Sequence, residues 1–106
     1  MKKFLFFVGL LFTLAVHGQD IKVVQINATW NNSNTRTDLE NLKGCSYSFG
    51  WLEEQTSALQ SKITAVPVVI IFKENVPVKT YTAGISLELN ISFAELQQTI
   101  YALKED

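Results

Sequence analysis

The chain has 106 residues, nine basic and ten acidic, with a single histidine and a single cysteine, Cys45. This length leaves room for one domain. A nearly balanced charge without a basic cluster argues against nucleic acid or an anionic membrane surface as a partner. One thiol cannot form an internal disulfide, and the chain has too few cysteines and histidines for a zinc site, so we expect no metal and no cofactor.

Residues 1–18 have the order of a secretory signal peptide. Two lysines precede an uncharged apolar run, Phe4 to Val16, and His17 and Gly18 follow. The run has 13 residues, whereas a membrane-spanning helix needs roughly 20. We expect cleavage after Gly18, export to the periplasm or the extracellular space, and no stable membrane insertion afterwards. An uncleaved anchor is the alternative.

Cleavage would leave 19–106 as the domain, with seven basic and ten acidic residues and a formal charge of −3. It would also remove His17, the only imidazole. Histidine is the commonest general base and a common metal ligand, so its loss argues against general-base catalysis.

The first half of this domain predicts two strands and two helices. A β-branched, apolar segment at 21–28 indicates a strand. The capping residues of Asn31 to Thr35, followed by Leu39 and Leu42, predict a short helix ending near Lys43-Gly44. Strict alternation at 45–52 predicts a strand with Cys45, Tyr47, Phe49 and Trp51 on one face. A second helix is expected at 56–62.

The second half predicts a hairpin and a helix. The apolar run Val68 to Phe72 is typical of a strand buried on both faces. A turn at Glu74-Asn75 leads into a strand at 78–83. A capping box, Ser92-x-x-Glu95, opens a helix with one apolar stripe, formed by Phe93, Leu96, Ile100 and Leu103.

The predicted order is therefore β-α-β-α-β-β-α, an α/β fold. The first two strands should be parallel, joined by a right-handed crossover, and the last two should form an antiparallel hairpin. We expect one mixed four-stranded sheet with helices on both faces.

Three segments of this chain resemble landmarks of the thioredoxin-like superfamily. Residues 24–34, with Ala28 and Trp30, resemble the stretch that ends in A-x-W-C-x-x-C. Val66-Pro67 and the apolar run after it are similar to the family's cis-proline strand, and Ala83-Gly84 resembles its Val-Gly pair. The resemblance covers 21–104 and implies a minimal thioredoxin fold.

The same resemblance implies a protein without the family's redox chemistry. Asn31-Asn32-Ser33-Asn34 stands in place of C-x-x-C, so Asn31 and Asn34 occupy the positions of the two cysteines. An amide is not a useful nucleophile near neutral pH and cannot attack or resolve a disulfide. The family's buried acid corresponds to Gln25, which does not titrate. We therefore expect no dithiol oxidoreductase activity.

In thioredoxins the matching residues surround a groove that holds an extended peptide. The first functional hypothesis is therefore a peptide-binding or protein-binding module. Its groove would be formed by Trp30, Asn31, Asn32, Ser33, Asn34, Val66, Pro67, Ala83 and Gly84, although these residues could equally serve only the fold.

Two alternatives remain open. The 45–52 strand should be a sheet edge, because the extra N-terminal strand of full thioredoxins is missing, so the chain could be a structural subunit or homodimer associating there or through Cys45. A single-cysteine thiol enzyme is the lesser alternative.

The ordinary interpretation of Cys45 is a buried small hydrophobic residue, and that of Asn31 to Thr35 is helix N-capping rather than an anion site. Gln25 and Asn27 should have hydrogen-bond partners.

Overall fold

The computed structural model describes residues 21–105, so the expected signal peptide and its cleavage site lie outside the described residues. The elements, in chain order, are β1 (Ile21–Asn27), the 3-10 helices η1 (Thr29–Asn34) and η2 (Leu39–Asn41), β2 (Ser46–Trp51), η3 (Leu52–Glu54), α2 (Ser57–Gln60), β3 (Val68–Lys73), β4 (Val76–Thr82) and α3 (Phe93–Lys104).

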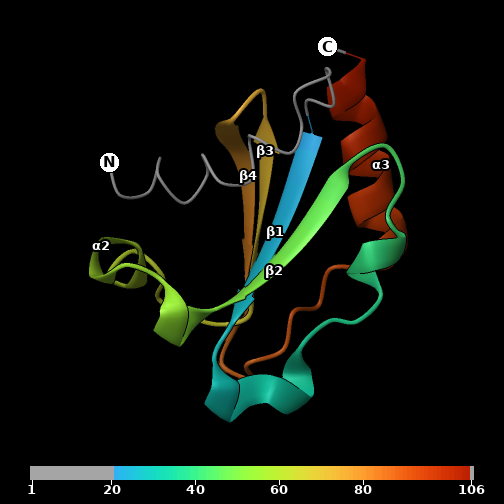
Figure 1. The fold of residues 1–106 in the computed structure, drawn as a ribbon. Coiled ribbons are helices and arrows are strands. Elements are labelled where there is room, and N and C mark those ends of the chain that lie inside the picture. The colour runs from blue at the N-terminus through green and yellow to red at the C-terminus, as the bar shows by residue number, and fades with distance from the viewer. Residues whose placement is uncertain (1–20, 106) are drawn as a thin grey trace.

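The four strands form one mixed sheet in the order β2-β1-β3-β4 (Figure 1). β1 pairs parallel with β2, while β3 is antiparallel to both β1 and β4. These pairings confirm the predicted parallel first pair, the hairpin and the edge position of β2. The two central strands are the most apolar, and all of β1 and the Val68 to Phe72 run of β3 are buried.

The hairpin turns at Glu74 and Asn75, which have φ angles of 52° and 70°. Two successive residues with positive φ are typical of the type I′ turn, whose twist matches that of the flanking strands. Asn75 tolerates this conformation well, and its side-chain oxygen accepts a hydrogen bond from the Lys22 ammonium at 2.9 Å. The turn therefore ties the hairpin to the first strand.

Each face of the sheet carries its own apolar core. On one face, α3 and η2 cover residues from β1 and β3, and α3 contributes Leu96 and Ile100, both fully buried. On the other face, Leu59 of α2 packs on a second cluster of apolar side chains from β1 and β3. Leu52 and Ile63 lie at the margin of this cluster. The predicted coverage of both faces is confirmed, and so is the apolar stripe of α3.

The predicted helix between β1 and β2 is wrong. The chain there forms two short 3-10 helices joined by an extended stretch, not an α-helix. The reason lies in Gln25 of β1, whose side-chain oxygen accepts from the Arg36 N–H and whose amide donates to the Arg36 carbonyl, both at 2.9 Å. Those backbone groups are then not available for helical hydrogen bonds.

The second predicted helix exists but is shorter than 56–62. Thr56 is its N-cap and accepts a hydrogen bond from the Leu59 N–H at 3.2 Å. The helix ends at Gln60. One turn of helix is therefore all that this element contributes to its face of the sheet.

Candidate functional site

Three segments remote in sequence meet at one end of the sheet. η1 follows the end of β1, and the Val66-Pro67 peptide, which is cis, precedes the adjacent antiparallel β3. The Ala83 N–H donates to the Pro67 carbonyl at 3.1 Å, which brings the end of β4 to the same place. The structure thus brings together the predicted groove segments.

Asn31 links these segments through its side-chain amide. Its nitrogen donates to the Val66 carbonyl at 3.3 Å, to the Leu87 carbonyl at 3.1 Å and to the Asn27 side-chain oxygen at 3.1 Å. The residue is 5% exposed. Because its hydrogen-bonding groups are directed inward, Asn31 lies beneath the candidate groove and supports it.

The neighbouring amides complete this network. The Asn27 amide donates to the Asn31 carbonyl at 2.9 Å and to the Thr35 hydroxyl at 2.7 Å. The Asn34 amide donates to the Asn31 side-chain oxygen at 2.9 Å. The expected partners of Asn27 are therefore present, and the two residues at the cysteine positions are hydrogen-bonded to each other.

The N-capping interpretation of Asn31 to Thr35 is wrong. The N-cap of η1 is Ala28, which precedes these residues and has no side-chain acceptor. Asn31 is instead inside η1, with non-helical backbone angles of φ −112° and ψ 21°. Its side chain donates to the carbonyls of Val66 and Leu87, and we attribute the non-helical backbone angles of Asn31 to these contacts.

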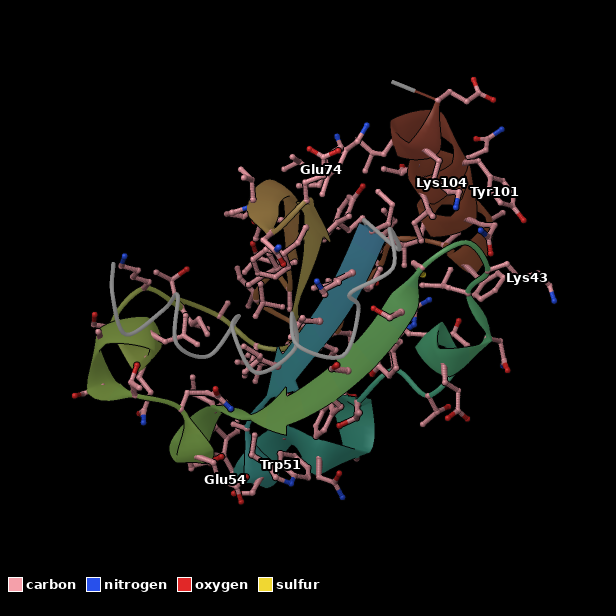
Figure 2. All side chains as sticks on the ribbon, turned by 45° about the horizontal axis from the view of Figure 1, so that its top comes forward. Lys43, Trp51, Glu54, Glu74, Tyr101 and Lys104 are labelled. Carbon is pink, nitrogen blue, oxygen red and sulfur yellow. The ribbon has the colours of Figure 1, made fainter. Side chains whose placement is uncertain are left out.

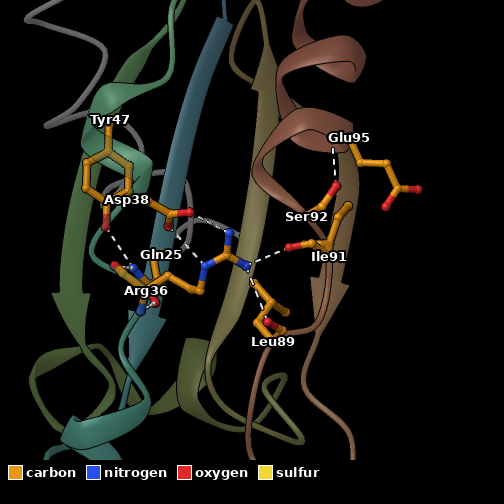
Figure 3. Close-up of polar contacts among 8 residues, drawn as sticks. All are labelled: Gln25, Arg36, Asp38, Tyr47, Leu89, Ile91, Ser92 and Glu95. Atoms are coloured by element: carbon orange, nitrogen blue, oxygen red, sulfur yellow. Dashed lines mark hydrogen bonds and ion pairs between the residues drawn. The ribbon is translucent and has the colours of Figure 1, made fainter.

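The Gln25 side chain organises a second network beside the first (Figure 3). Besides its pair of bonds with the Arg36 backbone, its amide donates to the Tyr47 hydroxyl at 2.8 Å. Gln25 is fully buried, so these partners offset the cost of removing its amide from water. Burial also raises the pKa of Tyr47 above its usual value.

Arg36 extends this network to the segment before α3. Its guanidinium forms a two-point contact with Asp38, at 3.0 and 2.9 Å, and donates to the carbonyls of Leu89 and Ile91 at 3.3 and 2.7 Å (Figure 3). The hydrogen bond from Arg36 lowers the pKa of Asp38. Sequence reasoning missed Arg36, because a lone arginine among threonines carries no signal for contacts more than 50 residues away.

The outer surface of the site carries both apolar and polar residues. Trp30 is 66% exposed and Ile85 is fully exposed, whereas Pro67 and Ala83 are buried. Gly84, between Ala83 and Ile85 in the sequence, is exposed, and a Cβ added there would meet nothing within 4 Å. Asn32 and Ser33 are also exposed. Of the predicted groove residues, Trp30, Asn32, Ser33 and Gly84 are thus the ones that a partner can reach most directly.

The start of η1 is fixed as well. The Glu53 carboxylate accepts from the Thr29 N–H, at 3.1 Å to each oxygen, and from the Thr29 hydroxyl at 2.9 Å. Hydrogen bonds from its own backbone and from Thr29 lower the pKa of Glu53. The loop that presents Trp30 is therefore held at both ends.

Chemically reactive groups are sparse here. Cys45 lies just before β2, half-buried against the core, and burial raises the pKa of its thiol to about 11. Within residues 21–105, no three His, Cys, Asp or Glu side chains are grouped so that they could hold a metal. Over the same residues, no helix is long and apolar enough to cross a membrane.

Comparisons with known proteins agree on the fold alone. No family model matches the chain, and no curated protein matches it significantly. Among solved structures, it is similar to thioredoxin f2 in complex with ferredoxin:thioredoxin reductase, with 18% identity, a TM-score of 0.64 and coverage of 93% of this chain and 88% of that one.

Two further thioredoxins give the same result. A mutant thioredoxin from Halobacterium salinarum NRC-1 is 16% identical with a TM-score of 0.62, covering 78% of this chain and 74% of that one. Schistosoma mansoni thioredoxin is 19% identical with a TM-score of 0.57, covering 89% and 86%. The chain has a thioredoxin-like fold and, with one cysteine, lacks the C-x-x-C pair.

Proposed function

We propose that this chain is an exported, redox-inactive thioredoxin-like scaffold that binds an extended segment of a peptide or protein. One observation carries the proposal: Trp30 is 66% exposed on η1, which the buried, internally hydrogen-bonded amide of Asn31 holds in place. A large exposed aromatic side chain on a fixed loop offers contact area at low entropic cost. The cis-proline segment and Gly84 lie at the same end of the sheet.

Redox inactivity follows from the chemistry at the two cysteine positions. Asn31 and Asn34 hold each other through an amide hydrogen bond, and neither has a sulfur that could form a mixed disulfide. Cys45 is separated from them in sequence and is half-buried, with a raised pKa that keeps its thiol protonated at neutral pH. The resting thiol is therefore a weak nucleophile.

An insulin-reduction assay tests this part. With dithiothreitol as electron donor, the protein and its Cys45→Ser variant should give the same rate as dithiothreitol alone. Turnover by the wild-type protein that the variant lacks would identify a thiol enzyme and overturn the proposal.

Binding is tested with the fluorescence of Trp30, isolated by the substitution Trp51→Phe. A permanently unfolded, carboxymethylated protein serves as the probe. We expect saturable quenching or enhancement, weakened by Ile85→Asp, which places a charge next to Gly84, and unchanged by Glu74→Ala at the hairpin turn. A fluorescence signal that does not respond to the probe at any concentration would remove the peptide-binding hypothesis.

Export is supported by the order of residues 1–18, in which two lysines precede a short apolar run. Mass spectrometry of the protein recovered from its own cell envelope is the direct measurement. We expect a chain beginning at Gln19, whereas an intact N-terminus in the cytoplasmic fraction would contradict export.

A further inference from the structure

β2 is an edge strand that lacks the usual protection against pairing. In the described sheet it contacts β1 on one side only. Its six residues, Ser46–Trp51, include no charge and no proline. The opposite edge, β4, carries Pro77, Lys79 and a register irregularity at its pairing with β3. Charges, prolines and bulges are the devices that keep edges from pairing. The β4 edge therefore has features that oppose pairing, and β2 has no charge or proline to oppose it.

The exposed part of β2 presents aromatic side chains on one face. Tyr47 and Phe49 lie opposite Val23 and Gln25 of β1, hence on the face that α3 covers. Phe49 is 37% exposed and packs edge-to-face on Trp51, with ring centroids 4.8 Å apart. A hollow of about 190 Å³, lined in part by Tyr47 and Phe49, adjoins them. A neighbouring strand could therefore bury further aromatic surface on this face.

The two ends of β2 carry opposite charges. Lys43 precedes the strand and Glu54 follows it (Figure 2). Glu53 is next to Glu54 in the sequence and adds a second negative charge at that end. A segment with a positive start and a negative end is complementary to an antiparallel copy of itself, because each end then meets the opposite charge. A second copy of the chain is the partner that this arrangement fits.

We propose that β2 pairs antiparallel with β2 of a second copy across a two-fold axis at Ser48, to form an eight-stranded sheet. An isologous interface of this kind is the commonest in homodimers. The inference is independent of the groove at the end of the sheet.

Symmetry and the strand's own hydrogen bonds select this register. A two-fold axis perpendicular to the sheet preserves its faces, so each residue is opposed by a residue on the same face of the other copy. The residue on the axis is opposed by the same residue of the other copy. The Trp51 carbonyl is already occupied by the Gln55 amide at 2.9 Å, which confines new pairing to residues 46–50. Ser48 is the midpoint of that stretch.

The register accounts for the side chains on both faces. It sets Tyr47 opposite Phe49 of the other copy, and Ser46 opposite Gly50. Beyond the paired stretch, it turns the Lys43 end of each strand towards the end of the other copy that carries Glu53 and Glu54. Cross-strand aromatic pairs and opposite charges both stabilise antiparallel pairing.

The arrangement separates the two thiols. Cys45 lies three residues from the axis, so the two Cys45 residues are about 20 Å apart along the paired strands. A disulfide requires Cα atoms within roughly 7 Å. A strand-paired dimer and a Cys45–Cys45 bridge are therefore mutually exclusive, and the two can be told apart.

Cysteine cross-linking tests the register. In the full chain carrying Cys45→Ser, the substitution Ser48→Cys should yield a covalent dimer under mild oxidation, because directly opposed residues have suitable separations. Thr80→Cys on the β4 edge is the matched control and should remain monomeric on non-reducing gels. Cross-linking of neither variant, or of both equally, would overturn the proposal, as would a dimer held by native Cys45.

Sedimentation analysis tests the charges. We expect a reversible dimer that weakens about tenfold in Lys43→Glu, where two symmetric attractions become repulsions, and recovers in part when Glu54→Lys is added. Lys62→Glu makes the same charge change away from β2 and should leave the dimer unchanged. A protein that is monomeric at every concentration would refute the inference, and so would equal effects of Lys43→Glu and Lys62→Glu.

Discussion

The side chain of Asn31 shows how an amide can take over a position that suits a thiol in the related fold. It donates to carbonyls on two segments that lie 35 and 56 residues further along the chain. A cysteine could not make these contacts, because its S–H is a single weak donor. At this position the chain thus has an amide that joins two segments by hydrogen bonds, whereas a dithiol protein has a reactive sulfur.

Replacing Asn31 by alanine should lower the free energy of unfolding by about 2 kcal/mol, because the buried carbonyl of Val66 and the partly buried carbonyl of Leu87 would both lose this donor. Urea denaturation monitored by circular dichroism measures the change. Asn32→Ala is the control, since Asn32 is exposed and surface substitutions usually change stability by less than about 0.5 kcal/mol. Equal effects of the two substitutions would show that the network adds nothing to stability.

Cys45 gives a prediction on pH. Burial raises the pKa of its thiol to about 11 from 9.0, while the positive charge of Lys104 opposes the shift. The folded state therefore holds the proton more tightly than the unfolded state, so stability is unaffected below the unfolded pKa and falls as pH rises from about 9 towards 11.

The rate at which iodoacetamide alkylates Cys45 should depend on the same thiol pKa. In the folded protein the rate should rise with pH to a midpoint near the raised pKa of about 11, and in urea the midpoint should move down by roughly two units. Equal midpoints with and without urea would mean that Cys45 is already open to water, and rapid reaction at pH 7 would revive the thiol-enzyme alternative.

At the scale of elements, the strands could be predicted because their signals are local. The apolar run at 68–72 and the alternation at 45–52 indicate strands without reference to the rest of the chain, and both lie within one residue of the observed bounds. The order of elements then fixed the parallel and antiparallel pairings.

The segment between β1 and β2 could not be predicted in the same way. Its conformation depends on Gln25, which pairs with the Arg36 backbone, and on Asn31, which reaches the segment before β3. These are contacts between elements, and a helical pattern in the segment itself does not reveal them. The meeting of the segments around Asn31, Pro67 and Ala83 could be expected from the resemblance, whereas the inward orientation of Asn31 and the contacts of Arg36 could not.

The N-cap of α3 is a local feature with a measurable contribution. The Ser92 hydroxyl accepts from the Glu95 N–H at 3.0 Å, as half of the predicted capping box requires (Figure 3). Ser92→Ala should destabilise the protein by about 1 kcal/mol. Ser86→Ala, at an exposed turn position, is the matched control in the same denaturation experiment. A loss no larger than that of the control would mean that packing alone fixes the start of α3.

At the scale of the whole molecule, the two faces of the sheet are unequally covered. α3 spans 12 residues and buries Leu96 and Ile100 completely, whereas α2 has four residues and buries only Leu59. A hollow of about 340 Å³ remains on the α2 face. It is lined by Leu59, Lys62, Ile63, Thr64, Val68, Ile70, Pro77, Thr80 and Thr82.

This asymmetry predicts how the molecule opens. Segments with few buried apolar contacts exchange their amide hydrogens through local opening, at a lower free energy than global unfolding. We expect the amides of 52–64 to exchange at least about tenfold faster than those of β1 and β3, and α3 to lie between them. Hydrogen exchange followed by mass spectrometry resolves these segments.

The variant Leu59→Ala sharpens the experiment, because Leu59 is the one buried side chain that α2 contributes to its core. It should accelerate exchange in 52–64 while leaving the order of β1, β3 and α3 unchanged, since α3 packs on the opposite face. Leu96→Ala, in contrast, should accelerate exchange throughout the sheet, because that core joins α3 to both central strands. If Leu59→Ala also opened the whole sheet, the two faces would form one cooperative unit, and the unequal coverage would have no consequence for the dynamics.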